Sequence, residues 1–323
     1  MCDAGNAPPR VLLSVAVVDR HVRGYPARCL ESLGASSPPA GVEYLWITDA
    51  ASASPFPAVR KIVAREGDRA AAKNIAIAES RGEWILLTTS DMVARRHAAE
   101  VMIAFLSGES DPSVASAQIL SENGMRRRTA FAFPSLMSEM NPLARLRRLS
   151  VVSDSRGRPP RTGRPYRVEA FRAAFLVARR EVFDLVGEFR SGYRFGMEDI
   201  EWCWRAGRHG VARYVVPEAH AFCLAPQERG RLGPAHHVEI SRSIERMVEA
   251  CRGRKYAMLF RAARRVKWMG ALPLLCVLDV VRSGRSPGLR RAVARHCALL
   301  GILRDVEALA DDAESRVRWE EMI

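Results

Sequence analysis

The first ninety residues alternate short apolar runs with stretches of helical character. Residues 11–18 form a nearly unbroken apolar run rich in valine, as in a strand that is covered on both faces, and residues 43–48 and 83–88 are predicted as two further strands. Between them, residues 26–34 and 69–82 have helical spacing or an alanine-rich composition, and each ends in glycine. This order predicts an α/β fold whose strands pair in parallel through right-handed crossovers.

Each of the three predicted strands is followed by an aspartate. Asp19 and Asp49 come directly after the first and second strands, and Asp91 comes shortly after the third. In open parallel sheets, ligands bind beyond the carboxyl ends of the strands, so the three carboxylates are expected at one binding edge. Any one of them could equally be an ordinary turn residue, because aspartate is common after strands.

The pattern is looser beyond Asp91. We expect a helix over 97–108, a strand over 113–120 with a hairpin-type turn at SENG, and a strand that runs into a helix over 173–187. Residues 153–165 combine Pro, Gly and Arg without periodicity and predict a long basic loop. Such a loop is either a lid or binding loop or a plain solvated insertion.

From about residue 236 the pattern is entirely helical and strongly basic. We therefore expect two regions, residues 10–235 and 236–323. The apolar patch 269–281 is too short to span a bilayer and contains Pro273 and Asp279. A basic amphipathic helix beside it favours association with a membrane surface, and packing on the first region with solvated arginines is the alternative.

Composition narrows the class of partner and the compartment. The 323 residues carry a formal net charge of +14, which favours phosphate-bearing partners. A nucleic-acid binder ranks last, because no recognised motif or aromatic and basic stacking surface is present. The seven scattered cysteines form no CxxC pair, which fits a reducing cytosol. The N-terminal sequence has no signal-peptide pattern, and we expect a cytoplasmic protein that is not exported and does not span a membrane.

An acidic triplet stands out at residues 195–210, FGMEDIEWCWRAGRHG. Glu198, Asp199 and Glu201 lie at the start of a predicted helix, with Arg205 and Arg208 near its end. This distribution complements the helix dipole, and the local pattern alone favours that structural interpretation. We expect Glu201 to be a solvated helix residue.

Four segments resemble, in order, the family 2 glycosyltransferases with a GT-A fold, particularly the rhamnosyltransferase-like bacterial members. They lie within about residues 11–222 and read SVAVVDRHVRGYPARCLESL, WITDAAS, RAAAKNIAIAESRGEWILLTTSDM and RAAFLVARREVFDLVGEFRSGYRFGMEDIEWCWRAGRHG. The resemblance implies a mostly parallel sheet flanked by helices, followed here by a C-terminal helical extension. It also implies inverting transfer of a sugar, by direct displacement, from a nucleotide-diphosphate sugar to an acceptor hydroxyl with Mg²⁺ or Mn²⁺.

The resemblance implies roles for individual residues on the donor side. Asp49 matches the carboxylate that hydrogen-bonds the nucleobase. Asp91 matches the last acid of the metal-holding DXD element, whose other two positions are Thr89 and Ser90 here. His220 is a second candidate metal ligand, and Cys223 stands where the family often has a histidine. The remaining candidates for binding the nucleotide sugar are Asp19, Arg69, Lys73, Asn74 and Ser90.

On the acceptor side, Asp199 matches the family's catalytic base, with Glu198 as its orienting neighbour. Burial and the charge of Glu198 would make Asp199 a stronger base than a free aspartate. The implied acceptor is a glycan, a lipid-linked molecule or a small molecule, and the place of action is the cytoplasm, including the inner face of the plasma membrane. The alternative is a catalytically degenerate GT-A-like binding or scaffold protein, which Thr89, Ser90 and Ala50 support.

Overall fold

The computed structural model describes residues 11–19, 25–37, 39–49, 53–64, 68–140, 163–193, 196–224 and 234–281, together with 293, 297, 299 and 300. Their contacts divide the chain into two compact units. The described residues of the first unit lie within 11–132, 163–191 and 202–224. Those of the second lie within 133–140, 192–201 and from 234 onward.

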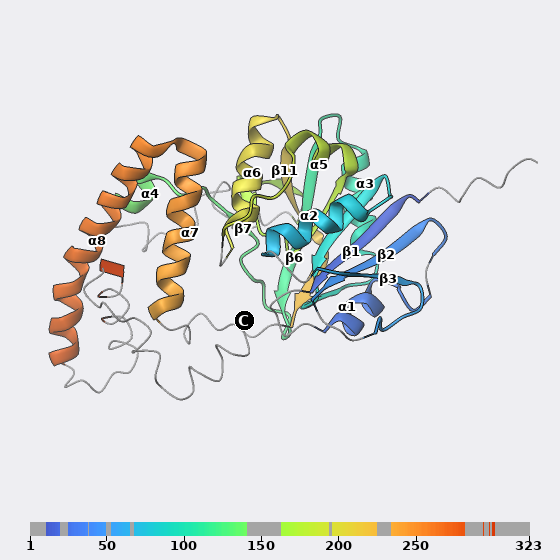
Figure 1. Ribbon diagram of the computed structural model, residues 1–323, viewed down its shortest axis with the longest axis horizontal. Helices are drawn as coiled ribbons and strands as arrows, with labels where there is room; N and C mark the ends of the chain where they lie inside the picture. Colours follow the sequence, from blue (N-terminus) through green and yellow to red (C-terminus); the bar gives the residue numbers. More distant parts are fainter. Residues whose placement is uncertain are drawn as a thin grey trace, which may run out of the picture. The chain divides into compact units, whose positions relative to one another are not determined.

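The first unit is built on one mixed sheet (Figure 1) with the strand order β3-β2-β1-β4-β10-β6-β11-β5, and β8 pairs with β11. Its strands are β1 (Leu13–Asp19), β2 (Val42–Thr48), β3 (Val59–Val63), β4 (Trp84–Thr89), β5 (Met92–Ala94), β6 (Ser113–Ser121), β8 (Tyr166–Arg167), β10 (Phe175–Arg179) and β11 (Ala212–Cys223). A separate two-stranded sheet joins β7 (Ala130–Phe131) and β9 (Ala170–Phe171).

Helices cover both faces of this sheet, which explains the largely apolar character of its inner strands β1 and β4. On one face, Val15 and Val17 of β1 share a buried cluster with α1 (Pro26–Ser32) and α3 (Ala98–Ser107). The alternate residues Ala16 and Val18 are also buried, on the opposite face. There α2 (Arg69–Glu79) crosses the strands in Figure 1, and α5 (Arg180–Val186) follows β10 directly.

The structure confirms the predicted order of strands and helices in the first ninety residues and adds β3. Pairing of β1 with β2 and with β4 is parallel, as expected. The far half of the sheet is mixed, because β10 runs antiparallel to both β4 and β6. Residues 153–162 of the predicted basic loop lie outside the described residues.

The second unit contains three helices among its described residues, and α6 begins in it. These helices are α4 (Leu136–Met140), α7 (Pro234–Arg252) and α8 (Arg254–Val281). Gly253, with φ +81°, makes the turn between α7 and α8. Lys267 of α8 pairs with Glu139 of α4, with Nζ and Oε2 2.6 Å apart. The contacts thus group α4 with the C-terminal helices, and the predicted boundary at 235 stays a prediction.

None of the helices in the described part of the chain is long and apolar enough to cross a membrane. The patch predicted over 269–281 forms the last part of α8, with Pro273 inside the helix.

Candidate functional site

The three aspartates predicted at one edge do end neighbouring strands of the sheet. Asp19 pairs in register with Thr48, the residue before Asp49, and Val18 pairs with Thr89 of β4. The pKa of Asp19 is raised, chiefly because burial disfavours the charged carboxylate and further because of the charges of Asp49 and Asp91. The three residues therefore share one electrostatic environment at the carboxyl edge.

Ser90 joins the ends of β1 and β4. Its hydroxyl donates a hydrogen bond to Asp19 Oδ1 at 2.5 Å, and its amide donates to Val18 O at 3.1 Å. Its carbonyl accepts from the amide of Tyr25, just before α1, at 3.0 Å. Trp46 Nε1 lies 3.4 Å from the other oxygen of Asp19. Ser90, which stands at the middle position of the predicted DXD element, thus fixes the carboxylate of Asp19.

Asp91 is held on both of its carboxylate oxygens. Thr89 Oγ1 donates to Oδ1 at 2.5 Å, and Cys223 Sγ lies 3.4 Å from Oδ2. The backbone carbonyl of Asp91 also accepts from the amide of Leu224 at 2.9 Å. Arg127 Nη1 in turn donates to Cys223 Sγ at 2.9 Å. The carboxylate is 9% exposed and oriented from two strands, β4 and β11.

Three predicted donor-binding residues lie on α2. This helix begins after Asp68, whose carboxylate accepts from the amide of Ala71 at 3.1 Å. Lys73 is buried with its ammonium 5.1 Å from the centre of the Phe189 ring, and Asn74 exchanges two 2.8 Å hydrogen bonds with the backbone of Phe189. Lys73 and Asn74 therefore anchor α2 to the segment after α5, and binding of the donor by Arg69, Lys73 and Asn74 stays a prediction.

His220 lies in β11 where the pairing with β6 shifts register, between Val216 and His220. Its Nδ1 is 3.3 Å from Arg95 Nη1, and burial, followed by the charges of Arg95 and Arg126, lowers its pKa. Metal binding by His220 stays a prediction. No group of three or more His, Cys, Asp or Glu side chains in the described ranges is arranged to hold a metal ion.

The acidic triplet opens α6 (Glu198–Arg208), as predicted. All three side chains are buried, so the expectation that Glu201 is solvated was wrong. The two residues before the helix both have positive φ, +77° for Gly196 and +86° for Met197. This backbone is unusual for methionine and carries strain. Asp199 Oδ1 accepts from the amide of Ile200 at 3.0 Å.

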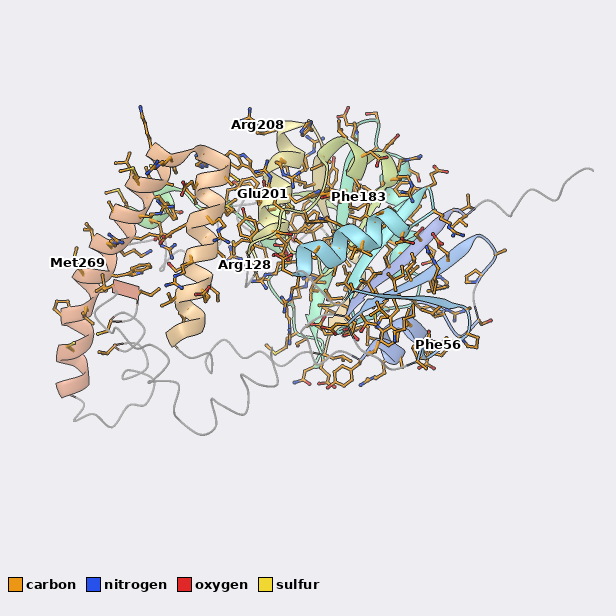
Figure 2. All side chains as sticks on the ribbon, viewed as in Figure 1. Phe56, Arg128, Phe183, Glu201, Arg208 and Met269 are labelled. Carbon is orange, nitrogen blue, oxygen red and sulfur yellow. The ribbon has the colours of Figure 1, made fainter. Side chains whose placement is uncertain are left out.

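Helix α6 is fixed in the first unit by an aromatic cluster. Trp202 packs with its ring 5.7 Å from that of Phe183 in α5, which is labelled in Figure 2, and 5.3 Å from that of Phe189. Trp202 Nε1 also donates to the carbonyl of Gly187 at 2.9 Å. The orientation of the helix is therefore set by burial of a large side chain one turn after Asp199.

We predict that Asp19→Asn raises stability near pH 7. Burial raises the pKa of Asp19 in the folded protein, so the cost of its charge is absent below the ordinary value of 3.8 and grows as the pH rises through the folded value. Asn removes this charge and can still accept the hydrogen bond of Ser90. The melting temperature of the variant should therefore exceed that of the wild type by a few degrees near neutral pH, and the gap should close in acid.

The control for this prediction is Asp184→Asn, at an exposed position of α5. It should leave the melting temperature nearly unchanged at every pH. A gap between Asp19→Asn and the wild type that does not depend on pH would contradict the electrostatic explanation.

No protein-family model and no curated protein sequence matches this chain. Comparison with solved structures does give a match. The crystal structure of GalNAc-T7 with UDP, GalNAc and Mn²⁺ superposes with a TM-score of 0.53 at 16% identity, over 74% of this chain and 48% of that chain. This chain has a GT-A fold.

The crystal structure of S. aureus TarS also matches, over 94% of this chain and 54% of that chain at 14% identity. Its TM-score of 0.44 is too low to show a shared fold. The chain spans about half the length of these two solved structures. The predicted GT-A fold is confirmed, and the family 2 and rhamnosyltransferase-like assignments stay predictions.

Sequence reasoning missed one member of the site and misjudged another. Arg127 follows the hairpin turn at 121–124 in a run of three arginines, and nothing in the sequence separates it from its solvated neighbours. Thr89 stands at a position where the family has an acid, and its hydroxyl orients Asp91. The contact of Arg127 with Cys223 joins residues 96 positions apart, whereas Thr89 and Asp91 are only two positions apart.

Proposed function

We propose that this GT-A-fold protein is an inverting glycosyltransferase that moves a sugar from a nucleotide-diphosphate donor to an acceptor hydroxyl. The observation that carries the proposal is the pair of carboxylates, Asp19 and Asp91, held in place by Ser90 and Thr89 at the carboxyl edge of the sheet. Two hydroxyls that orient two carboxylates favour a preorganised ligand site over a protein that serves only as a scaffold.

The donor lies, in this proposal, along the carboxyl edge. Asp49 is exposed at the end of β2, where its carboxylate can accept hydrogen bonds from a nucleobase. Arg69 and Lys73 would balance the charge of the diphosphate. The net charge of +14 favours such an anionic donor. GalNAc-T7, which shares the fold, was solved with UDP and Mn²⁺.

A divalent metal fits the residues present. Mg²⁺ and Mn²⁺ prefer oxygen ligands and are often held by one or two carboxylates together with substrate phosphates. Asp91 supplies one such carboxylate, oriented by Thr89. When bound, the metal would neutralise negative charge on the leaving diphosphate. The protein's own task is to hold the carboxylate at a fixed place and to exclude water from it.

Asp199 is the proposed general base. It would take the proton of the acceptor hydroxyl as the hydroxyl oxygen attacks the anomeric carbon, while the bond from that carbon to the diphosphate oxygen breaks with inversion. The burial of Asp199 and of its neighbour Glu198 supports this role, because a carboxylate removed from water is a stronger base. The fixed start of α6 would keep the carboxylate in place.

The proposal is tested by a thermal-shift and calorimetric screen of the full chain. The ligands are UDP, GDP, CDP, TDP and their common sugars, each with and without Mn²⁺ or Mg²⁺. We expect one nucleotide to raise the melting temperature only with metal, and Asp91→Ala to abolish this shift. If no nucleotide stabilises the protein, the scaffold alternative replaces the enzyme.

We further propose that α8 places the enzyme on an anionic membrane surface at the cytoplasmic side, close to lipid-linked acceptors. Four large apolar side chains of α8 are more than half exposed and recur at helical spacing, with Met269 at the side of the helix in Figure 2. They are Met258, Leu259, Val266 and Met269. Arg254, Lys255 and Arg265 are exposed on the same helix. Apolar side chains with cations beside them suit a bilayer surface that carries anionic lipid.

The double variant Leu259→Glu and Val266→Glu should weaken binding to vesicles that contain phosphatidylserine by on the order of a hundredfold, since burying each of these side chains contributes about 1.5–3 kcal/mol. Co-sedimentation measures this loss. Leu185→Glu, an exposed leucine of α5, is the matched control and should bind as the wild type does. Wild-type protein that stays in the supernatant would refute membrane association.

A further inference from the structure

Arg127, Cys223, Asp91 and Thr89 form one continuous chain of contacts at the carboxyl edge. Arg127 Nη1 lies 2.9 Å from Cys223 Sγ, Cys223 Sγ lies 3.4 Å from Asp91 Oδ2, and Thr89 Oγ1 lies 2.5 Å from Asp91 Oδ1. The function proposed above uses Asp91 but assigns nothing to Cys223 or Arg127. The thiol nevertheless faces the carboxylate that is proposed to hold the metal.

The fold places this thiol by two strand pairings. Cys223 is the last residue of β11, where it pairs with Met92 of β5 and with Ser121 of β6. Met92 directly follows Asp91, so pairing with β5 brings Cys223 beside the carboxylate. The register shift between Val216 and His220 selects which residue of β11 reaches this position.

The backbone of Arg127 is also fixed by hydrogen bonds. Its amide donates to the carbonyl of Ile119 at 2.8 Å, and its carbonyl accepts from Gln118 Nε2 at 3.2 Å, so both backbone groups are tied to β6. From this backbone position the guanidinium reaches the sulfur of Cys223 and donates a hydrogen bond to it. The sulfur of Cys223 is therefore contacted from two sides, by Arg127 and by Asp91.

The distance between the sulfur and the carboxylate oxygen suits a shared metal ion. A tetrahedral ion binds a thiolate sulfur at about 2.3 Å and a carboxylate oxygen at about 2.1 Å, so two such ligands lie about 3.6 Å apart. The observed separation of Cys223 Sγ and Asp91 Oδ2 is 3.4 Å. Little movement is therefore needed for both atoms to bind one cation.

We propose that Cys223 is a metal ligand and that, with Asp91, it forms an oxygen and sulfur pair. This inference rests on the proposed function only in taking Asp91 as the metal-holding carboxylate. On binding, the cation replaces the thiol proton, which passes to water, and the thiolate stays paired with Arg127. Thiolate ligands favour borderline and softer ions, so Zn²⁺ or Co²⁺ binds more tightly here than Mg²⁺.

The other candidate ligands near this edge have different partners. Cys29 Sγ lies 3.7 Å from the carbonyl of Thr89, and burial, with the charges of Asp91 and Asp19, raises the pKa of its thiol. His220 faces Arg95. Among the described residues, Asp91 and Cys223 supply two ligands, and a diphosphate that adds oxygen ligands should tighten binding of the metal.

Cobalt titration of the full chain tests this inference. Co²⁺ is added to the reduced protein, alone and with inorganic pyrophosphate, and the near-ultraviolet charge-transfer band from thiolate to Co²⁺ is recorded. The wild type should show the band, Cys223→Ser should lose it, and Cys251→Ser should keep it, since Cys251 lies on α7. Excess Zn²⁺ should displace the cobalt, whereas Mg²⁺ at the same concentration as the Zn²⁺ should not.

A second variant distinguishes loss of the thiolate ligand from misfolding of Cys223→Ser. Cys223→His keeps a metal ligand at the same place, so it should bind Co²⁺ in calorimetry without the charge-transfer band. A wild type that shows no band in either condition, or a band of equal strength in Cys223→Ser, overturns the proposal.

The two proposals fail separately in these experiments. Absence of the band while a nucleotide still stabilises the protein leaves the glycosyltransferase proposal standing without the thiol ligand. A cysteine-dependent band in a protein that no nucleotide stabilises leaves the metal site standing without the glycosyltransferase. Pyrophosphate is used because it supplies diphosphate oxygens whatever nucleobase the donor carries.

Discussion

Asp199→Asn is expected to lower kcat for sugar transfer by about 10²–10⁴-fold, the usual contribution of a general base. Asn is nearly isosteric, and its side-chain oxygen can still accept the 3.0 Å hydrogen bond from the amide of Ile200. The start of α6 should therefore be preserved while the ability to take a proton is lost. Rates are measured with saturating donor, once the nucleotide screen has identified it, and KM for the donor should change little.

The competing explanation for Asp199 is stabilisation of the helix dipole, and it predicts a different result. Glu181→Gln serves as the matched control, because Glu181 is an exposed acid in the first turn of α5. Loss of a carboxylate there should cost only about 0.3–1 kcal/mol of stability and leave kcat unchanged. If Asp199→Asn behaves like this control, with a small loss of stability and full activity, Asp199 is not the base.

Among alanine replacements of the described glycines, Gly82→Ala should cost the most stability, about 3 kcal/mol. A Cβ at Gly82 would lie 2.5 Å from the backbone nitrogen of Ser14 and 2.8 Å from the carbonyl carbon of Leu13. These are backbone atoms of the central strand β1, which cannot move aside. The amide of Gly82 also donates to Ser14 Oγ at 2.7 Å, and the clash would break this bond.

Urea unfolding measures this effect, with Gly108→Ala as the control. Gly108 follows α3, and a Cβ there would lie 3.5 Å from the carbonyl oxygen of Phe105, which is an ordinary contact. This variant should unfold within about 1 kcal/mol of the wild type. Equal unfolding midpoints for the two alanine variants would show that β1 yields at Gly82.

The first half of the sheet could be predicted from sequence because its signals are local. The largely apolar runs of β1, β2 and β4 reflect burial on both faces, and each strand leads into its own turn. Strand β3 was missed because Arg60 and Lys61 interrupt its apolar pattern at a sheet edge. The antiparallel direction of β10 depends on pairing between distant strands, which local periodicity does not contain.

The candidate site divides in the same way. The convergence of Asp19, Asp49 and Asp91 follows from strand order and was predicted. The contacts of Arg127 and Cys223 were not, because they depend on a hairpin and on a register shift in β11. The prediction that Glu201 is solvated was wrong, because the burial of a residue in the first turn of a helix depends on tertiary packing that the helical pattern does not contain.

The long-range pairing of β6 with β11 has a consequence for how the protein folds. Strands β1, β2 and β4 all lie within the first ninety residues, whereas β6 and β11 are separated by about 100 residues of chain, and such non-local pairings form slowly. We expect the aspartate-bearing edge to assemble early and β11 to join last. The step that completes the sheet is then also the one that delivers Cys223 to Asp91, so the thiol stays open to oxidation until folding is complete.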